Sequence, residues 1–81
     1  MRLDKYLKVS RLIKRRSVAK EASDAGVVMV NEREGKASTK LKEGDILEIR
    51  FGNRRMRVKV RALREHVGKD EAADLYEVLS D

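Results

Sequence analysis

The chain has 81 residues, of which 41% are hydrophobic and 42% charged, so it holds enough apolar material for one small core. Twenty Lys and Arg against 14 Asp and Glu leave a net charge of +6, which favours a polyanionic partner such as nucleic acid. Cys is absent, which excludes disulfides and thiolate metal sites, and no apolar run approaches the roughly 20 residues of a membrane span. No signal peptide precedes the charged start, so we expect a cytoplasmic protein without membrane contact.

Charge is arranged in blocks along the chain. The net charge is +7 over residues 1–20, −2 over 21–50, +6 over 51–64 and −5 over 65–81. No repeat or linker separates these blocks. We therefore expect a single domain over residues 1–81 with two basic segments and an acidic end.

The first half of the chain predicts two helices. Asp4 is expected to cap a short helix, in which Leu3, Tyr6 and Leu7 share an apolar face. A basic connection from Arg11 to Arg16 leads to a second helix.

The second helix is expected to be capped by Ser17. Val18, Ala22 and Ala25 have the spacing of a buried stripe, and Gly26 is suited to end the helix with a positive φ.

Strand signals begin after this second helix. Val27–Val30 is rich in β-branched residues and predicts a strand. Residues 31–35 read as a turn, and 36–42 as an irregular segment anchored by Leu41. Gly44-Asp45 then turns the chain into a strand over Ile46–Phe51.

Gly52-Asn53 predicts a hairpin turn to the clearest alternating strand in the chain. Its apolar residues are expected to point one way and its basic residues the other: Met56, Val58, Val60 and Ala62 against Arg55, Arg57, Lys59 and Arg61.

The acidic end is expected to hold a helical turn over Lys69–Asp74, capped by Asp70, and a closing strand over Leu75–Leu79. Phe51 and Tyr76 are expected in the core. This order predicts an α+β fold, with two N-terminal helices packed on a small, mainly antiparallel sheet that ends in a C-terminal hairpin and closing strand.

Nothing in the sequence indicates catalysis. His66 is the only histidine and has no nucleophile motif beside it, and the glycines form no phosphate-binding loop. We therefore expect a binding protein without catalytic residues, metal or cofactor.

The main candidate site is the basic connection before the second helix. Arg11, Lys14, Arg15 and Arg16 would meet a helix N-terminus that already carries partial positive charge, which suits a bound phosphate. A solvated basic turn is the alternative explanation. The cations of the first helix favour the phosphate site, because they should lie on the same side: Arg2, Lys5 and Lys8.

The basic side of the hairpin strand is a secondary candidate, formed by Arg55, Arg57, Lys59 and Arg61. These charges could contact nucleic acid, or they could protect an exposed edge strand against aggregation. Aromatic residues make up only 4% of the chain, which gives little support to base stacking. Structured RNA, recognised by backbone and shape, is the favoured partner.

These residues resemble a known family. RLDKYLKVSRLIKRRSVAKEASDAGVVMVN, followed by KAS and KLKEGDILEI, is similar to the S-four RNA-binding domain, or alpha-L motif, over residues 1–50. The resemblance implies RNA contacts by Arg2, Arg11, Arg15 and above all Arg16. Asn31-Glu32 stands where the family commonly has Asn-Gly, which leaves the turn and an RNA contact by Lys36 open.

A free-standing S-four domain with a basic hairpin, RFGNRRMRVKVRAL, and the ending EAADLYEVL is similar to the RqcP (YabO) family. The resemblance implies a monomer that binds stalled large ribosomal subunits, contacts large-subunit rRNA and peptidyl-tRNA, and assists the RqcH tailing factor in adding C-terminal alanine tails.

Other functions stay open. Heat-shock-type ribosome-recycling proteins share the domain but usually carry a longer basic C-terminal extension, whereas this chain ends acidic. A general nucleic-acid chaperone would bind DNA as well as RNA. A membrane-surface peptide would need a bulky apolar face that the alanine-lined second helix lacks.

Overall fold

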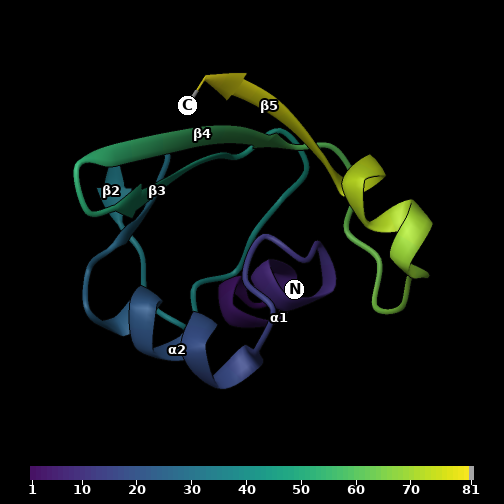
Figure 1. Cartoon of the computed structure of the whole chain (residues 1–81), viewed down its shortest axis with the longest axis horizontal. Helices are drawn as coiled ribbons and strands as arrows, with labels where there is room; N and C mark the ends of the chain where they lie inside the picture. The colour runs from purple at the N-terminus through teal and green to yellow at the C-terminus, as the bar shows by residue number, and fades with distance from the viewer. Residues whose placement is uncertain (81) are drawn as a thin grey trace.

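Two helices pack beneath a five-stranded antiparallel sheet, which confirms the predicted α+β class (Figure 1). The computed structural model describes residues 1–80. The sheet order is β2-β1-β3-β4-β5, and every neighbouring pair is antiparallel. The elements are α1 Leu3–Val9, α2 Arg16–Asp24, β1 Val28–Val30, β2 Arg33–Glu34, β3 Ile46–Phe51, β4 Arg54–Val60, the 3-10 helix η1 Lys69–Leu75 and β5 Tyr76–Ser80.

The core lies between α1 and the helix-facing side of the sheet. The expected apolar face of α1 is confirmed, because Leu3, Tyr6 and Leu7 are all fully buried. They belong to one cluster with buried residues of β3 and β4: Leu47, Ile49, Val58 and Val60. The alternation predicted for β4 follows, since its basic residues must point away from the helices.

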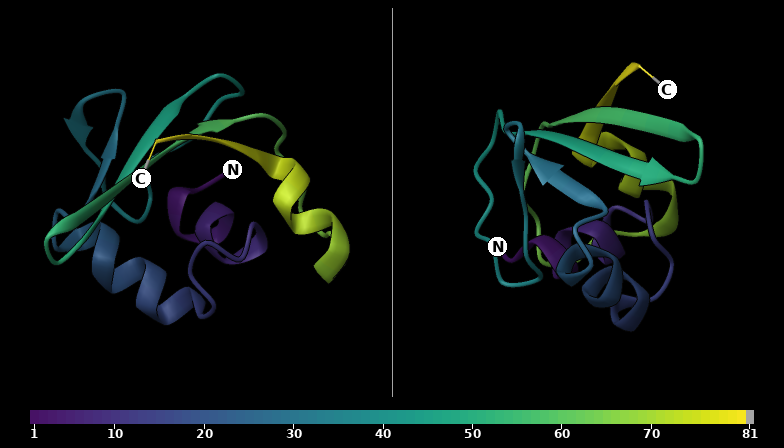
Figure 2. Two further views of the ribbon diagram at one scale, coloured as in Figure 1. Left: turned by 45° about the horizontal axis from the view of Figure 1, so that its top comes forward. Right: turned by 90° about the vertical axis from the view of Figure 1, so that its left-hand side faces the viewer.

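The C-terminal segment completes this core rather than trailing from it. Ala72 and Leu75 of η1 are buried, and β5 pairs with β4. The Tyr6 hydroxyl donates a hydrogen bond to the Leu75 carbonyl at 2.6 Å. Burial, followed by the nearby Tyr76, raises the pKa of Tyr6, so its hydroxyl remains a proton donor. Figure 2 shows α1 enclosed by the sheet, α2 and η1.

The predicted cap of α1 is wrong. The helix begins at Leu3, and its N-cap is Arg2, without a side-chain cap bond. The backbone N–H groups of Leu3 and Asp4 instead donate to the carbonyls of Thr39 at 2.8 Å and Ala37 at 3.2 Å. The loop after β2 thus satisfies the start of the helix, and the Asp4 carboxylate is left for other partners.

The predicted start of α2 is also wrong, because the helix begins at Arg16 and Ser17 makes no cap bond. Its buried face differs from the expected stripe as well. Ala19 and Ser23 are buried, while Val18 is 46% exposed. The Ser23 hydroxyl donates to the Ala19 carbonyl at 2.7 Å, which allows a polar residue on the packed face.

The end of α2 was correctly predicted. Gly26 has φ 82°, and its N–H donates to the Ser23 carbonyl at 3.2 Å. The Val27 N–H donates to the Ala22 carbonyl at 3.1 Å, which completes a Schellman motif.

Residues 31–35 hold a short hairpin that the turn prediction missed. Asn31 and Glu32 have φ 51° and 67°, and they turn β1 into β2. The Asn31 amide braces this turn, because its Oδ1 accepts the Ile46 N–H at 2.9 Å and its Nδ2 donates to Asp45 at 3.1 Å. The turn therefore forms without the glycine that the family commonly has at the second position.

Two further expectations in the second half are corrected. Phe51 is not in the core but 48% exposed, because β3 extends past the helices toward the hairpin turn. Asp70 is not a cap: Gly68 is the N-cap of η1 and no side-chain cap bond is present there. Leu41 is buried, as predicted.

Candidate nucleic-acid interface

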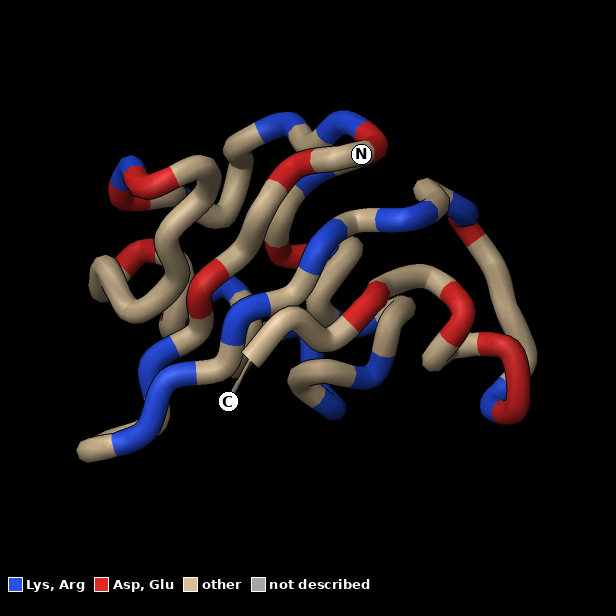
Figure 3. The backbone as a smooth tube through the Cα atoms, turned by 90° about the horizontal axis from the view of Figure 1, so that it is seen from above, with Lys and Arg blue, Asp and Glu red and all other residues tan. Residues whose placement is uncertain are grey.

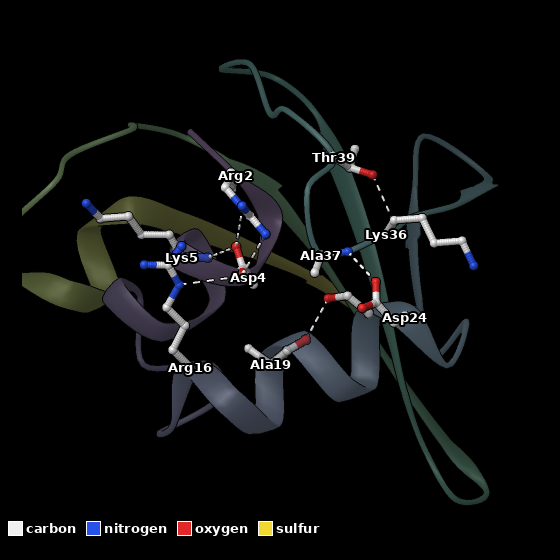
Figure 4. A network of polar contacts seen from close by, with 10 residues as sticks. Arg2, Asp4, Lys5, Arg16, Ala19, Asp24, Lys36, Ala37 and Thr39 are labelled. Atoms are coloured by element: carbon white, nitrogen blue, oxygen red, sulfur yellow. Dashed lines mark hydrogen bonds and ion pairs between the residues drawn. The ribbon is translucent and has the colours of Figure 1, made fainter.

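The buried carboxylate of Asp4 joins two arginines from different helices. Asp4 is only 2% exposed. Its Oδ1 accepts from Arg2 Nε at 3.2 Å and from the Lys5 backbone N–H at 2.8 Å. Its Oδ2 accepts from Arg16 Nε at 3.4 Å and from a terminal nitrogen of Arg2, also at 3.4 Å (Figure 4). The N-cap of α1 and the first residue of α2 are thereby held together.

Both arginines remain open to a ligand. The side chains of Arg2 and Arg16 are 48% and 50% exposed, although each contacts Asp4. A guanidinium has five N–H donors, so those not directed at Asp4 can meet a second acceptor. One carboxylate beneath two guanidinium groups leaves a net positive surface with a fixed geometry.

Two lysines of α1 extend this surface. A hollow of about 240 Å³ is lined by Lys5, Lys8 and Arg16, together with Val9, Glu65 and His66. Lys8 also lines an adjoining hollow of about 150 Å³ with Arg11. We call Arg2, Lys5, Lys8, Arg11 and Arg16, with Asp4 between them, the helix-end cluster.

Lys5 is already part of an ion pair, since its Nζ contacts the Glu65 carboxylate. The hydrogen bond from Lys5 lowers the pKa of this exposed Glu65 carboxyl. This pair connects α1 to the chain beyond β4 and reduces the positive charge that Lys5 can offer to a ligand.

Arg11 occupies a backbone conformation that favours glycine. It follows the last turn of α1 with φ 63°, and its N–H donates to the Lys8 carbonyl at 3.0 Å. A residue with a Cβ atom destabilises this conformation by about 1–2 kcal/mol. Arginine at this position fixes a cation at the end of α1 in exchange for some stability.

Among the described residues, no hydrogen bond or ion pair links the remaining candidates of this region to Asp4. Lys14 and Arg15 are exposed in the connection before α2. Lys36 lies near the opposite end of α2 from Arg16, and its Nζ contacts Glu34 at 3.3 Å (Figure 4). The structure therefore does not bring Lys36 to the helix-end cluster.

The secondary candidate lies on the side of the sheet that faces away from the helices. Arg55, Arg57 and Lys59 of β4 are exposed there, and Arg61 is exposed just after the strand ends. Arg57 and Lys59 pair with β3 on one side and with β5 on the other. Protection of an edge strand therefore cannot explain these two charges.

His66 is exposed, as expected, and lines the hollow beside Lys5 and Lys8. Among residues 1–80, no group of three or more His, Cys, Asp or Glu is arranged to hold a metal ion. No helix in this range is long and apolar enough to cross a membrane.

The residue that sequence reasoning missed is Asp4. Asp4 was expected to cap the first helix, whereas its carboxylate instead holds Arg2 and Arg16. The Arg-Leu-Asp spacing allows the contact with Arg2. No local signal indicates the contact with Arg16, which is twelve positions away and depends on how the two helices pack.

Comparison with known proteins shows the family to which this chain belongs. Residues 1–47 match the S4 domain, so the chain belongs to the S4 domain family. A protein of Streptococcus pneumoniae named RQC P-site tRNA stabilizing factor is 54% identical over 81 residues, covering all of this chain and 92% of that protein. The protein of the same name in Bacillus subtilis is 49% identical over 81 residues, covering 94% of its length. Within the S4 family the chain therefore groups with these factors.

A solved structure shows the same fold. The trimeric structure of Vibrio cholerae Heat Shock Protein 15 aligns with a TM-score of 0.90 at 28% identity. The alignment covers 99% of this chain and 82% of that one. Its extent shows that the C-terminal segment, and not only residues 1–47, belongs to a recurring arrangement.

Proposed function

We propose that this protein is a non-enzymatic RNA-binding factor of ribosome-associated quality control. It binds stalled large ribosomal subunits that carry peptidyl-tRNA and contacts both rRNA and tRNA. The observation that carries the proposal is the pair of half-exposed arginines, Arg2 and Arg16, held side by side by the buried Asp4. The names of the S. pneumoniae and B. subtilis relatives support the ribosomal setting.

The geometry suits a phosphate backbone better than a base. Arginine forks match phosphate oxygens in a bidentate manner, and lysines add charge around them. The aromatic residue nearest the cluster in sequence, Tyr6, is fully buried and has no face free for stacking. Recognition by charge and shape is therefore the mode we propose for the helix-end cluster.

In this role the protein contributes placement rather than chemistry. By gripping rRNA and tRNA together, it holds the peptidyl-tRNA in position while an RqcH-type factor adds alanine residues to the nascent chain. We propose that it acts as a monomer in the cytoplasm and needs no cofactor.

Arg16→Ala tests this proposal. The variant loses a charged contact to phosphate, so its affinity for large subunits should fall about tenfold or more. Co-sedimentation with large subunits and the yield of alanine-tailed chains measure the effect. Arg33→Ala is the matched control, because Arg33 is an exposed arginine of β2 outside the cluster.

Circular dichroism should show both variants folded, since Arg16 is half exposed. Unchanged sedimentation and tailing for Arg16→Ala would count against the proposal. Equal losses of affinity for both variants would show that the effect comes from net charge alone. That result would also count against the proposal.

A heat-shock-type recycling function is the second candidate, favoured by the similarity to the V. cholerae structure. Such a protein would bind free large subunits without supporting alanine tailing. Cells lacking the gene, complemented with the chain, separate the two candidates by whether tailing returns. Competition between large-subunit rRNA and DNA at matched salt separates both from a general nucleic-acid chaperone.

A further inference from the structure

The outward side of β3 and β4 carries arginines in an arrangement that is unfavourable without a ligand. Arg50 and Arg55 are direct partners in the antiparallel register, so two like charges face each other on one side of the sheet. Arg57 lies on the same side, opposite Glu48. We call Arg50, Arg55 and Arg57, with Glu48 among them, the hairpin face.

One carboxylate does not neutralise these cations. Glu48 Oε2 accepts from Arg50 Nε at 3.3 Å, and the Glu48 side chain is only 19% exposed beneath its neighbours. Within residues 1–80, neither Arg55 nor Arg57 takes part in a salt bridge. Within the described part of the chain, the hairpin face therefore holds two arginines that have no ion-pair partner, Arg55 and Arg57.

The same residues line an open groove. A hollow of about 470 Å³ is bordered by Glu48, Arg55 and Arg57, together with Asn53, Arg54 and Ser80. A second hollow of about 280 Å³ continues past Arg50, where a second carboxylate, Glu32, also lines it together with Met29 and Ile46. Figure 3 shows basic positions side by side on neighbouring strands toward the hairpin turn. All of the residues lining the first hollow are charged or polar, which suits a phosphate chain better than the apolar anchors of a protein partner.

This groove and the helix-end cluster lie on opposite sides of the sheet. The residues that alternate with the hairpin face, Ile49 and Val58, are buried against the helices. A ligand on one surface therefore does not exclude a ligand on the other.

We infer that the hairpin face binds the sugar-phosphate backbone of a second RNA segment, so that one protein molecule joins two RNA elements. The inference rests on the proposed function, because the helix-end cluster is taken to hold the first segment. It adds the site for the second contact, which the Asp4-linked arginines do not supply alone.

A two-RNA capture assay tests this directly. One RNA hairpin is immobilised through biotin, the full-length protein is added, and retention of a fluorescent copy of the hairpin is measured. The wild type should retain the second RNA. The double variant Arg55→Gln with Arg57→Gln should retain about tenfold less while still binding the immobilised hairpin.

Arg33→Gln with Arg64→Gln is the matched control. It removes two exposed arginines, neither on the hairpin face, and should retain the second RNA as the wild type does.

Three outcomes would overturn the inference. Equal loss in the control would assign the effect to total charge. Undiminished retention by the Arg55 and Arg57 variant would place the bridging elsewhere, for example in contacts between copies of the chain. If the wild type binds one hairpin but never retains the second, the hairpin face is not an RNA site, although the RNA binding proposed for the helix-end cluster stands. Absence of any RNA binding would instead contradict the proposed function itself.

Discussion

The helix-end cluster and the hairpin face both place a carboxylate among arginines, but they do so in different ways. Asp4 is 2% exposed and contacts Arg2 from its own segment and Arg16 from the next helix. Within residues 1–80, the Glu48 carboxylate forms an ion pair only with Arg50, two positions along its own strand. The first arrangement exists only when the two helices pack, whereas the second follows from strand pairing alone.

The difference predicts how each of the two proposed RNA-binding surfaces would bind its ligand. Arginines fixed by a buried carboxylate lose less side-chain entropy when a ligand arrives, so the helix-end cluster is organised in advance. The arginines of the hairpin face are not fixed in this way, so we expect them to act through charge density in a groove. We therefore expect the cluster to set affinity and orientation, and the hairpin face to add a weaker, more salt-sensitive contact.

Among the variants that test this comparison, Asp4→Asn should change RNA affinity the most. The change raises the net charge by one, so long-range electrostatics alone predicts tighter RNA binding. Loss of the charged contacts that order Arg2 and Arg16 predicts the opposite, a loss of about tenfold, because ordering each side chain costs about 0.5–1.5 kcal/mol. Fluorescence anisotropy with an RNA hairpin, at a temperature where circular dichroism shows folded protein, gives the sign.

Glu48→Gln is the control for this prediction. It also raises the net charge by one, but Glu48 links no separate elements, so RNA affinity should stay level or increase slightly. If Asp4→Asn also increased affinity, the idea that Asp4 organises the cluster would be wrong.

Arg11→Gly should have a smaller effect on RNA affinity and an opposite effect on stability. Glycine relieves the left-handed conformation at φ 63°, so the free energy of unfolding should rise by about 0.5–1 kcal/mol. RNA affinity should fall about threefold, as expected for one exposed charge contact. Chemical denaturation and anisotropy measure the two quantities.

Arg11→Gln separates strain from charge. It keeps the unfavourable backbone conformation and removes the cation, so the affinity loss should recur without the gain in stability. A destabilised Arg11→Gly variant, or one with unchanged RNA affinity, would contradict this interpretation of Arg11.

Much of the fold could be predicted because its signals are local. The alternation of β4 correctly placed Val58 and Val60 inside, and Gly26 ends α2 as its backbone freedom suggested. The apolar face of α1 followed from helical spacing alone. Likewise, the sequence positions alone show that each of the two helices begins among cations, whereas the contact of Arg2 and Arg16 through Asp4 depends on how the helices pack.

What could not be predicted depends on contacts between distant segments. The loop after β2 caps α1 with the Ala37 and Thr39 carbonyls, so the helix needs no side-chain cap. The Asp4 carboxylate can therefore contact Arg16. The buried face of α2 uses Ser23, whose hydroxyl is satisfied within the helix, so hydrophobicity did not reveal it. Phe51 is exposed because β3 extends beyond the helices. The alternation of apolar and polar residues along a strand does not show where the core ends.

The dependence of RNA affinity on salt tests the central claim most directly. If Arg2 and Arg16 contact phosphates together, replacing both with Gln should make the negative slope of log affinity against log salt shallower by about 1.4–1.8, or 0.7–0.9 for each phosphate contact. The double variant Arg33→Gln with Arg64→Gln should leave the slope unchanged. Equal slopes for the wild type and the Arg2 and Arg16 variant would contradict the account.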